Sequence, residues 1–423
     1  MSIFSALNTA TSALYAQSKA FTSISSNISN SSSTGYKATD TSFTALLTDS
    51  QTSSADYGGV IAGTTQTVSS QGDITSTDVT TNLALDGDGM FVVNDGSSTQ
   101  AYYTRDGSFS EDNSGYLVNT EGFYLEGWAT DDSGNILATN RSDTASLEKI
   151  NLDDISGSPK ATSKVTSSLN LPSDATVGSS YTTDTEVYDS LGNSSTVTMT
   201  WTKTGTNTWE LDASNPVSST DGSTVTGTTS GTPVSLVFNS DGSLASPTTD
   251  MQLSITGWSS GATDSTITLD YGENGGSGSI TQYASGSTTP AITTTGTPKQ
   301  DGYAKGTLTS VDIGTDGSVV ANFDNGQSKT VYKIPVATFA NADGLTAVSG
   351  QTYAQSTASG TYSLKEAGSD GAGTIESKSL ESSNVDVSDE LSRMIYAQQA
   401  YSAAAKVVST AQDMMDTLLQ AKR

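Results

Sequence analysis

Residues 3–28 read IFSALNTATSALYAQSKAFTSISSNI, and the spacing of their apolar positions decides the fold. Steps of four and three residues alternate through this segment, which is the pattern of a heptad stripe along one side of a helix. The stripe consists of Ile3, Leu7, Ala10, Leu14, Gln17, Phe21, Ile24 and Ile28. Ser2 is a suitable cap for the helix, and the polar run from Asn27 to Gly35 ends it.

The last segment of the chain repeats this pattern. The second stripe consists of Val387, Leu391, Met394, Gln398, Tyr401, Ala405, Val408, Gln412, Met415 and Leu419. Asp386 or Ser388 is the expected helix cap. Ser, Thr and Asn weaken the first helix, so we expect it to need a partner, either the other terminus or the same helices of neighbouring subunits. An ordinary amphipathic helix packed on its own domain is the alternative.

The sequence pattern between these ends is typical of strands and turns. Asp-Gly dipeptides at 86–87, 106–107, 241–242 and 316–317 are typical hairpin turns. A block rich in Thr and Ser has aromatic strands of its own, and strand patterning resumes from Gly302, which predicts an inserted domain.

We therefore expect a multidomain, mainly β protein with α-helical termini that pair like a coiled coil. The expected parts are a terminal helical assembly domain (1–35 and 386–423), an extended linker (36–71), a discontinuous β domain (72–146 and 297–375), an inserted outer β domain (147–296) and a connecting segment (376–385).

Charge is distributed unevenly along the chain. The net charge is -27, of which the ends (1–38 and 388–423) carry +2 and the middle -29. An acidic surface argues against nucleic acid as a partner, because phosphate binding needs clustered Lys and Arg. No run approaches the ~20 apolar residues of a membrane span, so we expect no membrane insertion. The first 20 residues also lack the pattern of a cleavable signal peptide.

The residue types that most enzymes use are missing. The chain has no Cys and no His, which removes thiolate chemistry, the commonest general base and the usual zinc ligands. A calcium loop beginning at Asp86 would need a Glu at its twelfth position, where Ser97 stands. There is no P-loop and no dinucleotide fingerprint. We expect no enzyme activity, no catalytic or metal-binding residues and no cofactor.

Several motifs in order along the chain resemble the axial proteins of the bacterial flagellum, and among these the hook proteins. Near the N-terminus these are Ser25–Asn30 and Thr34–Lys37; in the middle they are Leu83–Val93, Tyr103–Phe109, Gly122–Trp128 and Val187–Asn193; near the C-terminus they are Gly373–Ile375, Leu380–Asp386 and Met394–Tyr401. Two departures are Met90, where an aromatic residue is usual, and Ala404, where Asn is common.

The resemblance implies a structural subunit of the flagellar hook, outside the cell, that polymerises with itself into a curved flexible tube. This tube acts as a universal joint between rod and filament in motility. The implied partners are the rod, the hook cap, the hook–filament junction proteins and the flagellar type III export apparatus, which exports the chain without a cleavable signal peptide. The terminal helices would line the channel, with the β domains outside.

The stripes and the terminal motifs together predict the assembly interface. It comprises Ile3, Leu7, Leu14, Phe21, Ile24, Asn27, Ile28, Leu391, Met394, Ile395, Gln398, Tyr401, Val408, Met415, Leu418 and Leu419. A distal rod subunit is the alternative within the class, although rod proteins lack the block at 147–296. A secreted β-rich adhesin or surface-layer protein is the alternative outside it, but such a protein has no need for paired stripes. A secreted carbohydrate-active enzyme is a weaker alternative.

Overall fold

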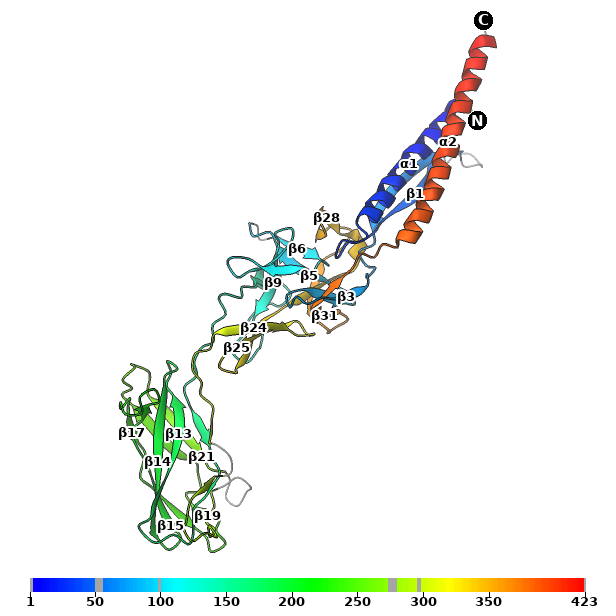
Figure 1. Ribbon diagram of the computed structural model, residues 1–423. Coiled ribbons are helices and arrows are strands. Elements are labelled where there is room, and N and C mark those ends of the chain that lie inside the picture. The colour runs from blue at the N-terminus through cyan, green and yellow to red at the C-terminus, as the bar shows by residue number, and fades with distance from the viewer. Residues whose placement is uncertain (1–2, 50–55, 98–99, 273–279, 295–297, 422–423) are drawn as a thin grey trace. The chain divides into compact units, whose positions relative to one another are not determined.

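The computed structural model describes residues 3–49, 56–97, 100–272, 280–294 and 298–421. The chain forms two compact units (Figure 1). The first unit comprises residues 1–155, 310–322 and 328–423, and the second comprises residues 156–309 and 323–327. The predicted fold class, mainly β with a helix at each end, is confirmed.

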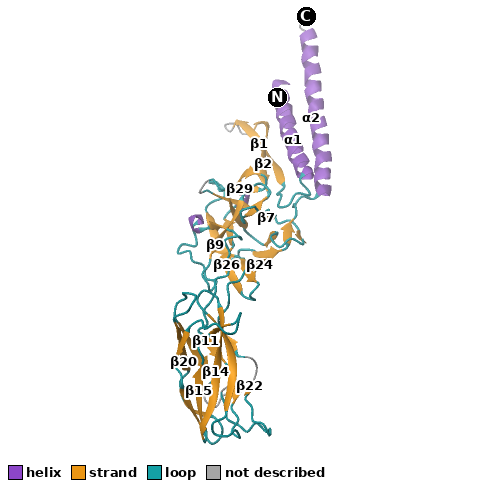
Figure 2. Cartoon of the chain, turned by 60° about the vertical axis from the view of Figure 1, so that its left-hand side comes forward, coloured by secondary structure: helices purple, strands orange, loops and turns teal. Residues whose placement is uncertain are grey.

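The two terminal helices lie side by side in the first unit (Figures 1 and 2). Helix α1 spans Ile3–Ser29 and helix α2 spans Val387–Ala421. Of the two expected caps for α2, the structure uses Asp386, whose Oδ1 accepts hydrogen bonds from the backbone N of Ser388 (2.8 Å) and of Asp389 (3.3 Å). We call α1 and α2 together the helical pair.

A β hairpin covers a second side of α1, within the segment predicted to be an extended linker. Strands β1 (Thr39–Asp49) and β2 (Asp56–Gln66) pair antiparallel. Besides bonds made by Asn27 near the end of α1, three hydrogen bonds join α1 to the hairpin. They run from Val60 N to Ser12 Oγ, from Lys19 Nζ to Ala62 O and from Thr41 Oγ1 to Ser23 Oγ, each 3.1 Å.

The β domain of the first unit is an antiparallel sheet with short accessory strands. The main path is β24 (Leu308–Ile313), β25 (Ser318–Phe323), β26 (Ser328–Lys333), β9 (Tyr124–Ala129), β5 (Met90–Asn94), β6 (Ala101–Thr104), β29 (Thr352–Ala354) and β28 (Thr346–Ser349). Strands beside this path are β7 (Phe109–Glu111), β8 (Leu117–Asn119), β10 (Glu148–Lys149), β27 (Pro335–Phe339) and β30 (Tyr362–Glu366). Short 3₁₀ turns are η1 (Thr144–Ser146) and η2 (Ala342–Gly344).

Two further strand pairs attach the segment before α2 to the β domain. Strand β3 (Ile74–Ser76) pairs with β32 (Ser379–Glu381), and β4 (Leu83–Asp86) pairs with β31 (Thr374–Ser377). The predicted connecting segment, 376–385, is therefore largely in sheet structure. Leu83, Phe91, Val93, Leu125 and Ile375, all fully buried, form part of one core cluster around these strands.

The second unit consists of two main sheets that share one core (Figure 2). The first sheet runs β13 (Ser180–Tyr188), β14 (Ser194–Gly205), β15 (Thr208–Ala213), β18 (Val234–Phe238) and β19 (Leu244–Ser246), with β16 (Val217–Ser218) beside β14. The other runs β17 (Thr228–Ser230), β20 (Met251–Thr256), β21 (Ser265–Asp270), β11 (Lys164–Thr166) and β23 (Lys299–Gln300), and a short pair joins β12 (Leu169–Asn170) to β22 (Thr293–Thr294). Inward residues alternate with outward ones, and Trp201 and Trp209 of the first sheet pack with Ile255 and Ile267 of the other.

The boundaries of the inserted unit differ from the predicted 147–296. Leu147 and Ile150 are buried in core clusters of the first unit, so the insert begins at residue 156. At the other end, β23 pairs with β11 of the second unit, so the insert extends past residue 296 to residue 309. The Thr and Ser content of the sequence does not locate these limits, because apolar and polar side chains alternate along the strands on both sides of each limit.

We predict that Glu126→Gln stabilises the protein at alkaline pH. Glu126 of β9 is 7% exposed, and burial raises its pKa from 4.5 to about 7, although Lys149 on the paired strand β10 opposes this. The folded state favours the protonated acid, so stability falls as pH rises from about 4.5 to 7. The variant should gain on the order of 2 kcal/mol at pH 8 and little at pH 4, measured by thermal melting. The exposed Glu148→Gln is the control, and a gain that does not depend on pH would contradict the prediction.

Candidate assembly interface

The contact between α1 and α2 is made largely by small side chains. On α1 the buried residues are Ala10, Ala16, Ala20, Ser23, Ile24 and Asn27. On α2 Ala397 and Ala411 are buried, and Met394, Ala400, Ala404, Val408 and Met415 are half-buried. Helices that meet through small residues approach closely, because the interaxial distance depends on the side chains at the contact.

The register of α2 differs from the predicted stripe. Ala397, Ala404 and Ala411 face inward, one residue before the predicted Gln398, Ala405 and Gln412, which are exposed. Met394, Val408 and Met415 belong to both sets. The prediction followed the larger side chains, whereas the subunit buries the alanines and leaves many large apolar side chains outside.

Asn27 joins both helices to the hairpin. Its Oδ1 accepts from Thr39 N (2.9 Å) and from the Tyr36 hydroxyl (3.1 Å). Its Nδ2 donates to Thr39 O (3.0 Å) and to Glu390 Oε1 of α2 (3.1 Å). The side chain is 1% exposed, and all four of its hydrogen-bonding positions are used.

The predicted interface residues thus divide into three groups. Ile24 (7% exposed) and Asn27 are buried in their own subunit, between the helical pair and the hairpin, and their contact with a neighbouring subunit stays a prediction. Leu7, Leu14, Phe21, Ile28, Met394, Val408 and Met415 are half-buried. Leu391, Ile395, Gln398, Tyr401, Leu418 and Leu419 are exposed. The side chain of Ile3 lies outside the described residues.

Large apolar side chains lie on all sides of α2. The exposed ones are Val387, Leu391, Ile395, Tyr396, Tyr401, Val407, Met414, Leu418 and Leu419, with exposures from 40% to 72%. At 100° per residue, Ile395 lies about 160° from the inward-facing Ala397. Large apolar side chains that are exposed on several sides of a helix indicate surfaces that other chains can cover.

Further exposed apolar residues lie on the neighbouring elements. Phe4 and Tyr15 of α1 and Phe43 and Ile61 of the hairpin are each 48% or more exposed. The predicted interface omitted these four and also Tyr396, Val407 and Met414 of α2. A strict heptad stripe admits only one side of each helix, and the hairpin lies in the segment predicted to be an extended linker. The sequence feature that could have identified them is a large apolar residue that lies outside the heptad stripe.

Two grooves run along the helical pair. One, of about 950 Å³, is lined by Phe21 and Ser25 of α1 and by Gln398 and Tyr401 of α2, among others, so it brings together three predicted interface residues. The other, of about 330 Å³, lies between the helices and β1 and has Ile24, Phe43, Arg393 and Tyr396 in its lining. Together they border the exposed apolar side chains on both sides of the pair.

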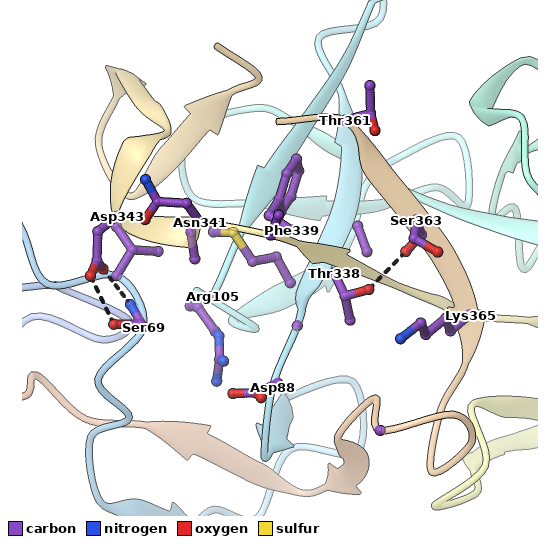
Figure 3. Close-up of a pocket in the computed structure, with 17 residues that line it drawn as sticks. Ser69, Asp88, Arg105, Thr338, Phe339, Asn341, Asp343, Thr361, Ser363 and Lys365 are labelled. Atoms are coloured by element: carbon purple, nitrogen blue, oxygen red, sulfur yellow. Dashed lines mark hydrogen bonds between the residues drawn. The ribbon is translucent and has the colours of Figure 1, made fainter. Parts of the chain in front are cut away.

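A polar pocket of about 720 Å³ lies in the β domain (Figure 3). Asp343 accepts from both the backbone N (2.8 Å) and the Oγ (3.0 Å) of Ser69, and Thr338 Oγ1 donates to Ser363 O (3.2 Å). These bonds hold segments of the chain together. Within the described ranges no three His, Cys, Asp or Glu residues are placed to hold a metal ion. No described helix is long and apolar enough to span a bilayer.

Comparison with known proteins gives matches over the whole chain. The flagellar hook protein FlgE of Brucella abortus is 34% identical over 428 residues, which cover 100% of both chains. The chain belongs to the flagellar hook protein family. FlgE of Rhizobium meliloti shows the same identity and coverage, and FlgE of Escherichia coli is 30% identical over 98% of this chain and 99% of its own.

Family models match in the same order as the structural parts. They are a flagella basal body rod protein model (7–37), the flagellar hook protein FlgE/F/G D1 domain (84–178), the flagellar basal body protein FlaE D2 domain (151–303) and the flagellar basal body rod FlgEFG protein C-terminal model (376–421). Helicobacter pylori flagellar hook protein FlgE2 has a similar fold, with a TM-score of 0.50 and 16% identity over 73% of this chain and 100% of its own.

Membership of the hook family settles the class of function. The protein is a structural subunit of the external flagellum and not an enzyme. The full-length matches to hook proteins also favour the hook over the distal rod and over an unrelated adhesin.

We predict that Asn27→Ala loosens the hairpin from the helical pair. The change leaves Thr39 N, the Tyr36 hydroxyl and Glu390 without their partner, at about 1–3 kcal/mol for each buried group left unpaired. The amide of Thr39 should exchange faster with deuterium, as measured by NMR or mass spectrometry. Asn30→Ala is the control, because the bonds of the Asn30 side chain are local: Nδ2 donates to Ser26 O and Oδ1 accepts from Ser33 Oγ. Unchanged protection of Thr39 in Asn27→Ala would show that the side chain is not the link.

Proposed function

We propose that copies of this chain assemble into the hook tube through the exposed apolar surfaces of the helical pair and the β1–β2 hairpin. The observation that carries this proposal is the ring of large apolar side chains around α2, since α1 covers only the alanine side. Neighbouring helical pairs are the partners that can cover the other sides. The tube then couples rod to filament as a curved, flexible joint.

The distribution of charge supports this arrangement. The terminal segments carry +2 against -29 for the middle, so many copies of the helical pair can pack closely without strong repulsion. The acidic β units are then placed in solvent around an inner layer of helices. The rod, the hook cap and the junction proteins would meet the same surfaces at the ends of the tube, after passage through the type III export apparatus.

The greater length of α2 adds a further surface for neighbouring copies. Helix α2 has 35 residues and α1 has 27, and Figure 1 shows the C-terminal end of α2 continuing past the start of α1. Leu418 and Leu419 lie in this continuation and are 57% and 66% exposed. No other element of the described chain covers them.

We predict that Ile395→Asp blocks assembly but leaves the monomer folded. Ile395 is 56% exposed in the subunit, so the change removes contacts only where another copy covers it. A loss of apolar burial of about 1.5–3 kcal/mol corresponds to a rise in the critical concentration of about 10- to 100-fold. The measurement is the protein left in the supernatant after the polymer is pelleted, with circular dichroism as the folding check.

The control for this variant is Val177→Asp in the second unit. Val177 is 64% exposed, so it matches Ile395 in type and exposure but lies outside the helical pair. The critical concentration of Val177→Asp should stay near that of the wild type. Normal assembly of Ile395→Asp would mean that the helical pair is not the interface.

We also predict that the second unit is dispensable for the tube. It has its own core, built around Trp201 and Trp209, and its own sheets. A variant in which a short Gly-Ser linker replaces residues 156–307, which leaves β24 intact, should therefore fold and form tubes, seen by electron microscopy. A folded deletion variant that forms no tube would place the second unit in the wall.

A further inference from the structure

The carboxylate of Glu381 is buried where the chain passes from the β domain to the helical pair. Its side chain is 0% exposed. Oε1 accepts from Lys37 Nζ (2.5 Å) and from Gly72 N (2.8 Å), and Oε2 accepts from Arg105 Nη1 (3.2 Å). One buried side chain thus receives three hydrogen bonds.

The three donors come from three separate segments. Lys37 lies between α1 and β1, Gly72 lies between β2 and β3, and Arg105 follows β6 in the β domain. Arg105 extends through the polar pocket of Figure 3, and its Nη2 also donates to Gly87 O (2.9 Å). Glu381 therefore connects both segments that flank the hairpin, and the segment that leads into α2, to the β domain.

A second residue repeats these connections close by. Asn384 Oδ1 accepts from Ala38 N (2.7 Å), and its Nδ2 donates to Thr67 O and to Ser70 O, each 3.2 Å. Ser70 O also accepts from Lys37 Nζ (2.6 Å). The segments that flank the hairpin are thus bonded twice to the segment before α2.

The backbones here are too close to accept side chains at two glycines. A Cβ at Gly72 would collide with the backbone oxygen of Ser382. Gly35, at φ +65°, would place a Cβ 2.6 Å from the backbone N of Asp106. Gly35 N also donates to Glu381 O (2.8 Å). The segments therefore have little room to shift past one another.

Burial of these charges is not an efficient way to gain stability. Two cations and a carboxylate lose their water, and desolvation lowers the pKa of Lys37 even though Glu381 opposes the shift. Apolar residues of the same size would serve stability about as well. What charged hydrogen bonds add is direction, because each fixes the orientation of the groups that it joins.

We propose that Glu381, Lys37, Arg105 and Asn384 form a positioning joint that holds the helical pair in one orientation relative to the β domain of the same copy. The inference rests on the proposed function. In the proposed tube the helical pairs pack against those of neighbouring copies and the β domains lie around them, so a loose connection would let the β domain of each copy take a different position on its helical pair. The joint makes the first unit assemble as one body.

The test measures the distance between the two parts directly. The chain has no Cys, so Ser402→Cys on α2 and Ser110→Cys on β7, both exposed, can carry spin labels without further changes. Pulsed electron paramagnetic resonance is recorded on monomers, and on tubes in which labelled copies are diluted with unlabelled copies of the same variant. The otherwise wild-type protein should give a single narrow distance in both.

Two variants perturb the joint, and one matched variant controls for the loss of a carboxylate. Glu381→Gln removes the charge at constant size. Arg105→Lys keeps the charge but cannot bond both Glu381 and Gly87 O in the same way. The control is Glu366→Gln, since Glu366 also pairs with two cations of the β domain, Lys333 (2.6 Å) and Arg141 (2.9 Å), but lies away from the joint.

The expected result is a broad distance distribution in both joint variants and a narrow one in the control, in protein whose β domain is still folded by circular dichroism. A narrow distribution in all three, or equal broadening in all three, would overturn the proposal. The monomer data separate this outcome from a failure of the proposed function, which would show as assembly that does not respond to Ile395→Asp.

Discussion

The two ends of the chain must lie side by side, and the rest of the structure follows from this constraint. Asn27 and Glu390 are 363 residues apart in sequence, yet their side chains share a hydrogen bond between the helices. The chain between these two residues must therefore run from one helix out to the β units and back to the other helix. The β domain is accordingly built from two separate stretches of chain, and the second unit is inserted within it.

This arrangement, in which the middle of the chain is inserted between two paired ends, accounts for the distribution of small residues and glycines. The helices meet through alanines, and the hairpin approaches α1 where Gly59 lies next to Ser12, whose Oγ would be 2.6 Å from a Cβ at Gly59. Further along, Gly35 and Gly72 admit the crossing segments near Glu381. There is no room for a side chain at these close approaches, whereas many large apolar side chains lie on the outer surface of the copy.

Periodic patterns in the sequence predicted the elements correctly, whereas changes in amino-acid composition misplaced the boundaries between them. Alternating steps of four and three residues predicted both helices, and Asp-Gly turns with alternating strands predicted the β units. The register of α2 was not predictable from size alone, because Ala397 and Gln398 both satisfy the stripe within one residue. The insert boundaries were missed because Leu147 looks like any strand residue until its contacts are known.

The candidate interface was predictable only in part for a related reason. Periodicity identifies the residues that face a partner but does not distinguish a partner in the same chain from one in another copy. Ile24 and Leu391 both belong to their stripes, yet Ile24 is buried in the subunit and Leu391 is 48% exposed. Only the contacts of the folded chain distinguish a residue that packs within the copy from one that is free to contact another copy, since α1 is covered on two sides and α2 on one.

The pairing of distant ends also has a consequence for the order of events during synthesis and export. Helix α1 emerges first and α2 last, so the alanine side of α1 stays uncovered until the whole chain is available. Contacts over such long sequence separations form late, because the intervening loop must close first. A chain that stops short of α2 therefore cannot complete the helical pair.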